Sequence, residues 1–129
     1  MVVVAAVIQK NERILIGQRK RKDRHSLKWE FPGGKVEARE SPREALAREL
    51  KEELNIDATI GGELTRYAYR YSSRPLFELI FFRVEHFEGE PENLAFETIA
   101  WVDPRTLPTY DFLDGDIEFV KALARGEFG

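Results

Sequence analysis

The chain has 129 residues, of which 43% are hydrophobic and 33% are charged, and none is cysteine. This length and composition predict a single globular domain, residues 1–129, and exclude disulfides, thiolate metal sites and cysteine nucleophiles. The net charge of −3 argues against nucleic-acid polymers and anionic membranes as partners. The apolar start, Met1–Ile8, lacks the length and the basic flank of a targeting segment, so we expect a cytoplasmic protein.

The first third of the chain predicts short strands separated by a turn and a loop. Two apolar, β-branched runs predict a hairpin of two strands, Met1–Gln9 and Arg13–Arg19. The strongly basic segment that follows, Lys20–Lys28, predicts a loop. A short extended piece, Trp29–Phe31, is expected to end at a turn over Pro32–Gly34.

The next predicted element is a helix from Ser41 to Leu54. Serine at the start can cap free backbone N–H groups, Pro42 suits the first helical position, and Glu44 completes a capping box. Asn55 marks the end of the helix, because asparagine tolerates the left-handed backbone conformation that closes many helices.

The second half of the chain predicts three strands and a final helix. Two long strands, Leu64–Ser72 and Leu76–Phe87, are joined near Ser73–Pro75, and a further strand follows at Thr98–Val102. Helical spacing of apolar residues predicts a helix over Asp116–Arg125, packed on the sheet. The order of strands, helix, strands and helix predicts an α/β sandwich with a mixed sheet between helices.

The first helix has two distinct faces. One face is apolar and should contact the sheet, with Leu46, Ala47, Leu50 and Leu54. The adjacent face gathers Glu49, Glu52 and Glu53, whose mutual repulsion costs about 0.2–0.5 kcal/mol per pair on an exposed helix. A hard divalent cation such as Mg²⁺ would explain this cluster, since it prefers oxygen ligands. The alternative is a solvated charged face in which Arg48 pairs with Glu52.

The loop before this helix turns the cluster into a motif. The spaced pattern is Gly34, five residues, Glu40, seven residues, Arg48-Glu49-Leu50, one residue, Glu52-Glu53, one residue, Asn55-Ile56. This pattern resembles the Nudix box and departs from it at Asn55, where the family has glycine; both residues reach positive φ. The segment Trp29–Glu37 resembles MutT-type members and their CTP pyrophosphohydrolase branch. The resemblance covers almost the whole chain and implies a Nudix-type α/β/α sandwich.

The resemblance also implies a metal site that binds Mg²⁺ or Mn²⁺. Its protein ligands would be the carboxylates of Glu49, Glu52 and Glu53, with the backbone carbonyl of Gly33. Arg48 would orient the carboxylates, since arginine offers several fixed donors. Glu40 would stabilise the loop and could assist the metal through water.

Two glutamates compete for the role of general base in the implied hydrolysis. Glu53 is the first choice, because family precedent places a glutamate of the box near the attacking water. A second family pattern uses a loop glutamate six residues before a tryptophan. Counting back from Trp101, that position holds Ala95, and Glu97 lies nearby but out of register. The alternative interpretation of Glu97 is a surface acid.

Nucleotide binding is expected from residues far from the helix. Arg19 and Arg74 occupy positions where MutT-like proteins place nucleotide-contacting arginines; solvated side chains at strand ends are the alternative. Phe31, Leu76 and Phe77 could wall a base pocket by stacking, or they could belong to the core. Strand alternation places Leu76 and Phe77 on opposite faces.

Asp116 is the expected base-reading residue. It aligns with an asparagine in MutT and with an aspartate in the CTP-cleaving branch, and a carboxyl can accept or, when protonated, donate hydrogen bonds. The alternative is an N-cap, a role that Asp114 could take instead. His25 and His86 are expected to be surface residues without a metal-binding role.

The implied activity is the hydrolysis of nucleoside triphosphates to the monophosphate and pyrophosphate in nucleotide-pool sanitation. The resemblance gives 8-oxo-dGTP as the first substrate, with CTP or dCTP close behind because of Asp116. The alternatives are hydrolysis of ADP-ribose or a dinucleoside polyphosphate, and a non-catalytic nucleotide-binding domain. The last would predict loss of the glutamates of the box, and all of them are present. Both a monomer and a homodimer fit the sequence.

Overall fold

The computed structural model describes residues 1–129. Its strands are β1 (Val2–Lys10), β2 (Arg13–Gln18), β3 (Trp29–Glu30), β4 (Gly33–Lys35), β5 (Asp57–Thr59), β6 (Glu63–Tyr69), β7 (Phe77–Val84), β8 (His86–Glu88) and β9 (Thr98–Val102). Its helices are α1 (Pro42–Leu54) and α2 (Ile117–Ala124), with two 3-10 helices, η1 (Pro104–Thr109) and η2 (Asp114–Asp116). None of the helices has both the length and the apolar character needed to cross a membrane.

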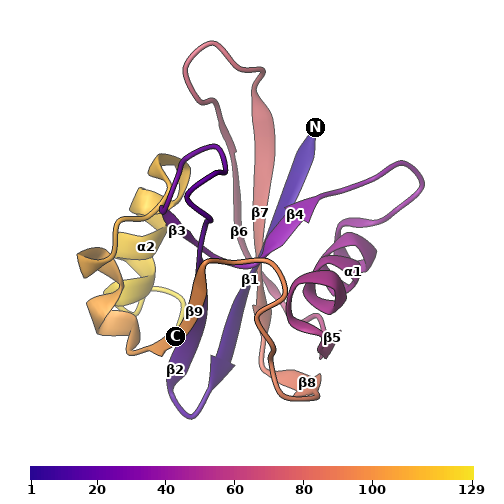
Figure 1. The fold of residues 1–129 in the computed structure, drawn as a ribbon, viewed down its shortest axis with the longest axis vertical. Helices are drawn as coiled ribbons and strands as arrows, with labels where there is room; N and C mark the ends of the chain where they lie inside the picture. The colour runs from indigo at the N-terminus through magenta and orange to yellow at the C-terminus, as the bar shows by residue number, and fades with distance from the viewer.

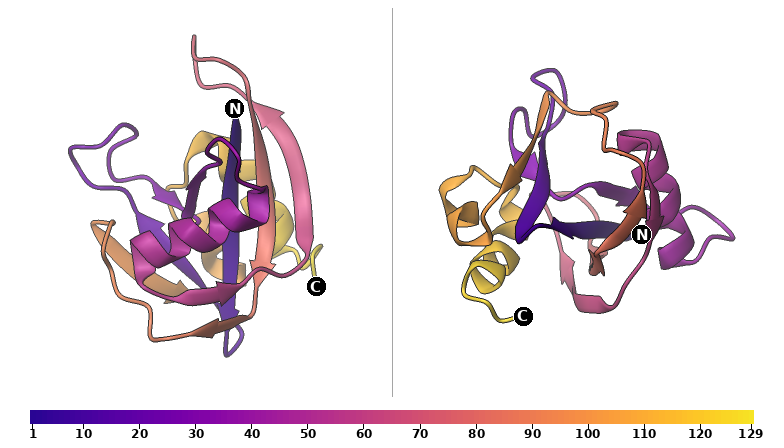
Figure 2. Two further views of the ribbon diagram at one scale, coloured as in Figure 1. Left: turned by 90° about the vertical axis from the view of Figure 1, so that its right-hand side faces the viewer. Right: turned by 90° about the horizontal axis from the view of Figure 1, so that it is seen from below.

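A mixed sheet forms the middle layer of the fold. Its strands run in the order β3-β2-β1-β7-β6, with β4 paired to β1 and β9 paired to β2. The central strand β1 is antiparallel to β2 and parallel to β7. Figures 1 and 2 show α1 on one face of this sheet and α2 with the 3-10 helices on the other. The predicted α/β/α sandwich is therefore confirmed.

Strand β1 links the two layers of core. Its side chains alternate between faces, as in any extended strand. Val4, Ala6 and Ile8 pack into the core beneath α1, while Ala5 and Val7 pack into the core beneath α2. A strand buried on both faces needs a continuous apolar run, which explains the composition of the N-terminal segment.

Helix α1 begins and ends as the sequence predicts. The Glu44 N–H donates to Ser41 Oγ and the Ser41 N–H donates to the Glu44 carboxylate, which is the predicted capping box. Asn55 closes the helix in the left-handed conformation with a φ of 54°. Its fully buried leucines are the predicted ones, Leu46, Leu50 and Leu54. The prediction for Ala47 is wrong, because Ala47 borders a surface hollow and Ala45 is buried in its place.

The predicted turn over Pro32–Gly34 is confirmed at Pro32, where the chain bends and reverses direction between β3 and β4, and is wrong for the two glycines. Gly33 and Gly34 instead begin β4, where they pair with Ala5 and Val4 of β1. A Cβ atom on Gly33 would overlap the backbone carbonyl of Val4. The glycines therefore permit a close strand pairing directly after the chain changes direction.

The predicted strand Leu76–Phe87 is two strands in the structure. β7 ends at Val84, and β8 then leaves the main sheet to pair with β5, directly after α1. The apolar and aromatic run is almost continuous in the sequence, so the break is decided by pairing with a distant segment. Strand β5 and the 3-10 helix η1 were not predicted.

Candidate active site

The carboxylate cluster on α1, which we term the acidic face, consists of Glu49, Glu52 and Glu53. Arg48 is bonded to two of these residues, since its Nη1 donates to Glu49 at 3.0 Å and to Glu52 at 3.3 Å. The same guanidinium donates to both carboxylate oxygens of Glu40, at 2.6 and 3.0 Å. The bonds from Arg48 and then from the Glu37 N–H hold the pKa of Glu40 at about 2. This geometry is the one that the predicted orienting role of Arg48 requires.

Glu53 is hydrogen-bonded to strand β4 and not to Arg48. Its Oε1 accepts a hydrogen bond from the Gly33 N–H at 3.0 Å. Burial, followed by repulsion from the carboxylates of Glu30 and Glu49, raises the pKa of Glu53 to about 9. Glu49 lies so close to Gly34 that a Cβ atom there would overlap its carboxylate. Strand β4 therefore brings two glycines directly against two residues of the acidic face.

Beside Glu53 opens a cavity of about 260 Å³, which we term the site cavity. It is bordered by the start of β1, by β4 and by the segment before α2. Of the residues predicted from the sequence, its lining includes Arg19, Phe31, Gly33, Glu53, Phe77 and Asp116. One cavity therefore brings together Gly33 and Glu53 of the expected metal site and most of the residues expected to bind the nucleotide.

Asp116 is the one charged residue of the chain in the buried class, at 6% exposure. Its side chain makes no capping bond to α2, so the N-cap alternative is wrong. Burial and then the charge of Glu30 raise the pKa of Asp116 to about 8. At neutral pH this carboxyl is therefore a neutral acid that can both donate and accept a hydrogen bond.

Glu30 has two charged neighbours in the site cavity, Arg19 and Asp116. Arg19 Nη1 lies 3.2 Å from Glu30 Oε1. Burial raises the pKa of Glu30, and the charge and hydrogen bond of Arg19 oppose this rise without cancelling it. Arg19 is thus engaged with a cavity carboxylate and is not the freely solvated side chain of the alternative interpretation.

Aromatic rings form another wall of the site cavity. Phe77 is stacked on Tyr71 with ring centroids 6.1 Å apart and planes 9° apart. Phe31 also lines the cavity, but it is 3% exposed and stacks on Phe112, so it belongs to the core as well. His25 lies 4.6 Å from Tyr71 and borders the cavity. His25 is half-buried, so the prediction of a surface residue holds only in part: its loop folds against this aromatic wall.

Other predicted residues lie outside the cavity. Arg74 is exposed in the turn between β6 and β7, and Leu76 is 55% exposed. Glu97 is exposed and its N–H donates to the Gln18 carbonyl. The remaining predicted surface histidine, His86, is exposed as expected.

Sequence reasoning missed several residues that line the cavity. They include Glu30, Lys35, Tyr71 and Leu113. A signal existed for Glu30, since a single acid stands between Trp29 and Phe31 in a short strand. No comparable signal marks Tyr71, because it is one of several tyrosines near the end of a strand.

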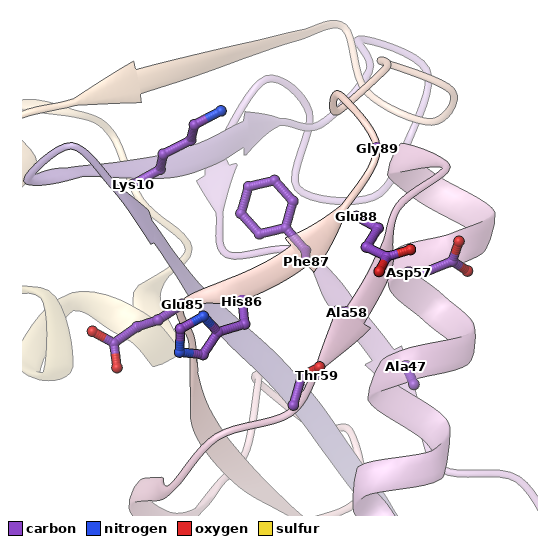
Figure 3. Close-up of a pocket in the computed structure, with 10 residues that line it drawn as sticks. All are labelled: Lys10, Ala47, Asp57, Ala58, Thr59, Glu85, His86, Phe87, Glu88 and Gly89. Atoms are coloured by element: carbon purple, nitrogen blue, oxygen red, sulfur yellow. The ribbon is translucent and has the colours of Figure 1, made fainter.

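A second hollow, of about 700 Å³, lies between α1, β5 and β8. Figure 3 shows Asp57 and Glu85 at its borders, pointing away from each other, and Phe87 between them. Its acidic side chains are exposed to solvent, and none of the predicted site residues lines it. Cavity size therefore does not mark the site in this molecule; buried carboxyl groups do.

The acidic face has the donor chemistry that a hard divalent cation prefers, since all its ligands would be oxygen atoms. Burial and then neighbouring carboxylates raise the pKa of Glu53, and a cation would stabilise its ionised form and relieve the repulsion. With Glu49 and Glu52 bonded to Arg48, no three acidic or histidine side chains are arranged around one metal position. The residues present fit a metal ion that competes with Arg48 for these carboxylates.

Comparison with known proteins agrees with this geometry. The Nudix domain family matches residues 1–123. A CTP pyrophosphohydrolase of Escherichia coli (strain K12) is 37% identical over 121 residues, 94% of this chain and 89% of that protein. An 8-oxo-dGTP diphosphatase of Haemophilus influenzae is 32% identical over 125 residues, 95% of this chain and 91% of that protein. The solution structure of the E. coli ORF135 protein matches with a TM-score of 0.86 and 35% identity, covering 98% of this chain and 89% of that one.

This chain belongs to the Nudix family, as the spaced motif predicted. It is a Nudix hydrolase by its family and its relatives. Nudix hydrolases act on nucleotide substrates and generally need a divalent cation.

Proposed function

We propose that this chain hydrolyses nucleoside triphosphates to the monophosphate and pyrophosphate with Mg²⁺, as a nucleotide-pool sanitation enzyme. Mn²⁺ would substitute for Mg²⁺, because both accept oxygen ligands. The relatives described above are named for reactions on CTP and on 8-oxo-dGTP, which supports this substrate class. The cytoplasmic location and the choice between monomer and homodimer stay predictions.

A single observation carries the proposal: Glu53 and Asp116 line the same cavity. Glu53 is the residue of the acidic face that lines this cavity, and here the phosphates of a nucleotide would meet the cation. Asp116 is buried near Glu30 and Phe77, where a base would find hydrogen-bonding groups and an aromatic surface. A nucleoside triphosphate has this same division between an anionic tail and a flat polar ring.

The chain's own residues supply orientation and a proton acceptor. When bound, a divalent cation neutralises phosphate charge and lowers the pKa of water. Arg48 holds Glu49 and Glu52 in place. A bound cation would offset the burial and repulsion that raise the pKa of Glu53, so that this carboxylate, bonded to the Gly33 N–H, would be ionised and would take the proton of the attacking water. The water oxygen forms a bond to phosphorus, the phosphoanhydride P–O bond breaks with its electron pair on the leaving oxygen, and two phosphate products separate.

The neutral form of Asp116 bears on the choice of base. Cytosine presents a ring nitrogen acceptor beside an amino donor, and a neutral carboxyl satisfies both. Guanine and 8-oxoguanine present N–H donors that either form of the carboxyl can bind. Loss of the Asp116 proton would therefore selectively weaken the binding of cytidine nucleotides, because a carboxylate would then face the lone pair of the ring nitrogen.

A nucleotide panel with Mg²⁺ tests this proposal. It contains CTP, dCTP, dGTP, 8-oxo-dGTP, ADP-ribose and a dinucleoside tetraphosphate, with pyrophosphate and monophosphate measured as products. We expect turnover of cytidine triphosphates and of 8-oxo-dGTP, with kcat/KM for CTP falling above pH 8 relative to 8-oxo-dGTP. Turnover confined to ADP-ribose or the dinucleotide would refute the substrate class. No turnover of any substrate would support the non-catalytic alternative.

A further inference from the structure

Two tyrosine hydroxyl groups hold one peptide unit from both sides. Tyr67 Oη donates a hydrogen bond to the Gly115 carbonyl at 2.6 Å. The Gly115 N–H donates to Tyr71 Oη at 2.8 Å. Tyr67 lies on β6 and Tyr71 just beyond its end, so both partners come from one edge of the main sheet. Gly115 lies in η2, directly before Asp116.

This contact is tightly packed as well as bonded. Gly115 is buried, and a Cβ atom built on it would lie 2.7 Å from Tyr71 Oη and 3.1 Å from Tyr69 Cδ2. The first distance is too short for a Cβ contact and the second is tight, so the glycine brings the η2 backbone directly against the tyrosines. Tyr67, Tyr71 and Gly115 together form what we term the tyrosine clamp.

The segment that leads to Asp116 is also hydrogen-bonded to the sheet at its other end, at Leu113. The Leu113 N–H donates to the Trp29 carbonyl at 3.0 Å, next to Glu30 on β3. Asp116 therefore follows a short segment that is anchored to β3 at one end and to the tyrosine clamp at the other. Both anchors act on backbone atoms, so they set the position of Asp116 without changing its chemistry.

Tyr71 has a second role, because its ring lines the site cavity. It stacks on Phe77 and contacts His25 at a ring distance of 4.6 Å. The side chain that holds the backbone beside Asp116 is thus also part of the wall that a base would touch. A change at Tyr71 would move the hydrogen-bonding group and the aromatic surface together.

We propose that Tyr67 and Tyr71 are positioning residues for nucleobase selection, which act by holding the Gly115 peptide so that Asp116 faces the site cavity. This inference rests on the proposed function, in which Asp116 contacts the base. It adds a specificity device built from a strand that carries none of the metal-side residues. Selection then depends on how firmly η2 is held, as well as on which residue stands at position 116.

The first test is Tyr71→Phe, which removes the hydroxyl and keeps the ring. Loss of one hydrogen bond to a buried N–H should raise KM for CTP about fivefold, while kcat stays within about twofold. The preference for CTP over dGTP should fall by a similar factor. Tyr69→Phe is the matched control, since Tyr69 lies on the same strand and contacts Gly115 without bonding its peptide. The proposal is overturned if both variants keep the wild-type KM and preference.

A double-mutant cycle separates positioning from a general loss of stability. Gly115→Ala should raise KM for CTP, because its methyl group would meet Tyr71 Oη. Tyr71→Phe removes that oxygen, so the double variant should bind CTP no worse than Gly115→Ala alone. Effects that multiply independently would show that the two residues do not form one clamp, and would overturn the proposal.

Binding of CMP and GMP, measured by calorimetry, keeps this test separate from turnover. If the wild type hydrolyses no nucleotide, the proposed function fails, but a CMP preference that Tyr71→Phe loses and Tyr69→Phe keeps still supports the clamp. If turnover occurs and Tyr71→Phe retains the wild-type ratio of CMP to GMP affinity, the clamp fails while the proposed function stands. Failure of the wild type to prefer either monophosphate overturns the clamp as a selection device.

Discussion

The acidic face and the base side of the site cavity give their carboxyl groups different charged neighbours. On the acidic face, Glu49 and Glu52 keep partial contact with solvent and are bonded to Arg48. On the base side, Asp116 is buried and has another acid, Glu30, as its charged neighbour. On the acidic face Arg48 supplies a cationic partner, although burial still raises the pKa of Glu49. On the base side, burial beside a like charge favours a neutral acid suited to directional hydrogen bonds. One site therefore uses the same functional group for charge on one side and for selection on the other.

Glu53 lies where these two regions meet, and its removal should have the largest effect. Glu53→Gln keeps the size of the side chain but removes the proton acceptor and an expected metal ligand. We expect kcat on CTP to fall by about a thousandfold or more. Pyrophosphate release with Mg²⁺ measures this loss, and Glu118→Gln, at an exposed position on α2 outside the cavity, is the control with wild-type activity. Full activity of Glu53→Gln would remove this residue from the mechanism.

The next effect concerns stability and its dependence on pH. The pKa of Asp116 is raised by folding from its usual 3.8 to about 8, so the protonated form is the one that the fold favours. The stability that this proton supplies is complete below pH 4 and is lost as pH rises through 8. Relative to Asp116→Asn, the free energy of unfolding of the wild type should fall by several kcal/mol over this interval, on the order of 6 kcal/mol at about 1.4 kcal/mol for each pKa unit.

Urea unfolding at a series of pH values measures this difference, in buffers that keep both proteins folded. Glu30, Tyr67 and Tyr71 face Asp116 and are present in both proteins, so their titration largely cancels in the comparison. Asp114→Asn, at an exposed neighbouring position, should leave the pH profile unchanged. Parallel profiles for the wild type and Asp116→Asn would mean that Asp116 is ionised in the folded protein.

A smaller effect is expected from a change at Arg48, whose guanidinium is bonded to the carboxylates of the acidic face. Arg48→Lys keeps one positive charge but cannot bond to Glu40, Glu49 and Glu52 at once. We expect about a tenfold loss in kcat/KM, partly recovered at high Mg²⁺ concentration, because a cation can orient the carboxylates itself. Lys51→Ala removes an exposed charge from the same helix and should leave kcat/KM and its Mg²⁺ dependence unchanged. An unaltered Mg²⁺ dependence of Arg48→Lys would exclude a role in orienting these groups.

The smallest effect should separate the two predicted arginines. Arg19 is paired with Glu30 in the site cavity, whereas Arg74 is exposed and outside it. Arg74→Ala should change KM for CTP by less than about twofold, the range of a surface substitution. Arg19→Ala should raise KM further, since it leaves Glu30 without its cationic partner. Equal KM values for the two variants would show that the pairing inside the cavity does not contribute to binding.

The sequence predicted the acidic region in detail because its signals are local. The capping box, the end at Asn55 and the buried leucines follow from side chains within one helix, and the structure contains all three. The same reasoning misplaced Gly33 and Gly34, because their pairing partner β1 lies far away in the sequence. It also joined β7 to β8, because only the contact with β5 separates them.

On the base side, the amino-acid sequence by itself determined candidates, among them Arg19, Phe77 and Asp116, and the family to which the chain belongs. The tertiary structure decided which candidates meet, since strand pairing brings Arg19 and Asp116 to one cavity and leaves Arg74 outside. It also decided the proton on Asp116, because a pKa depends on burial and on neighbouring charge, and neither is visible in a linear chain. The spacing of residues specifies a helix and its motif; the environment of each carboxyl exists only after folding.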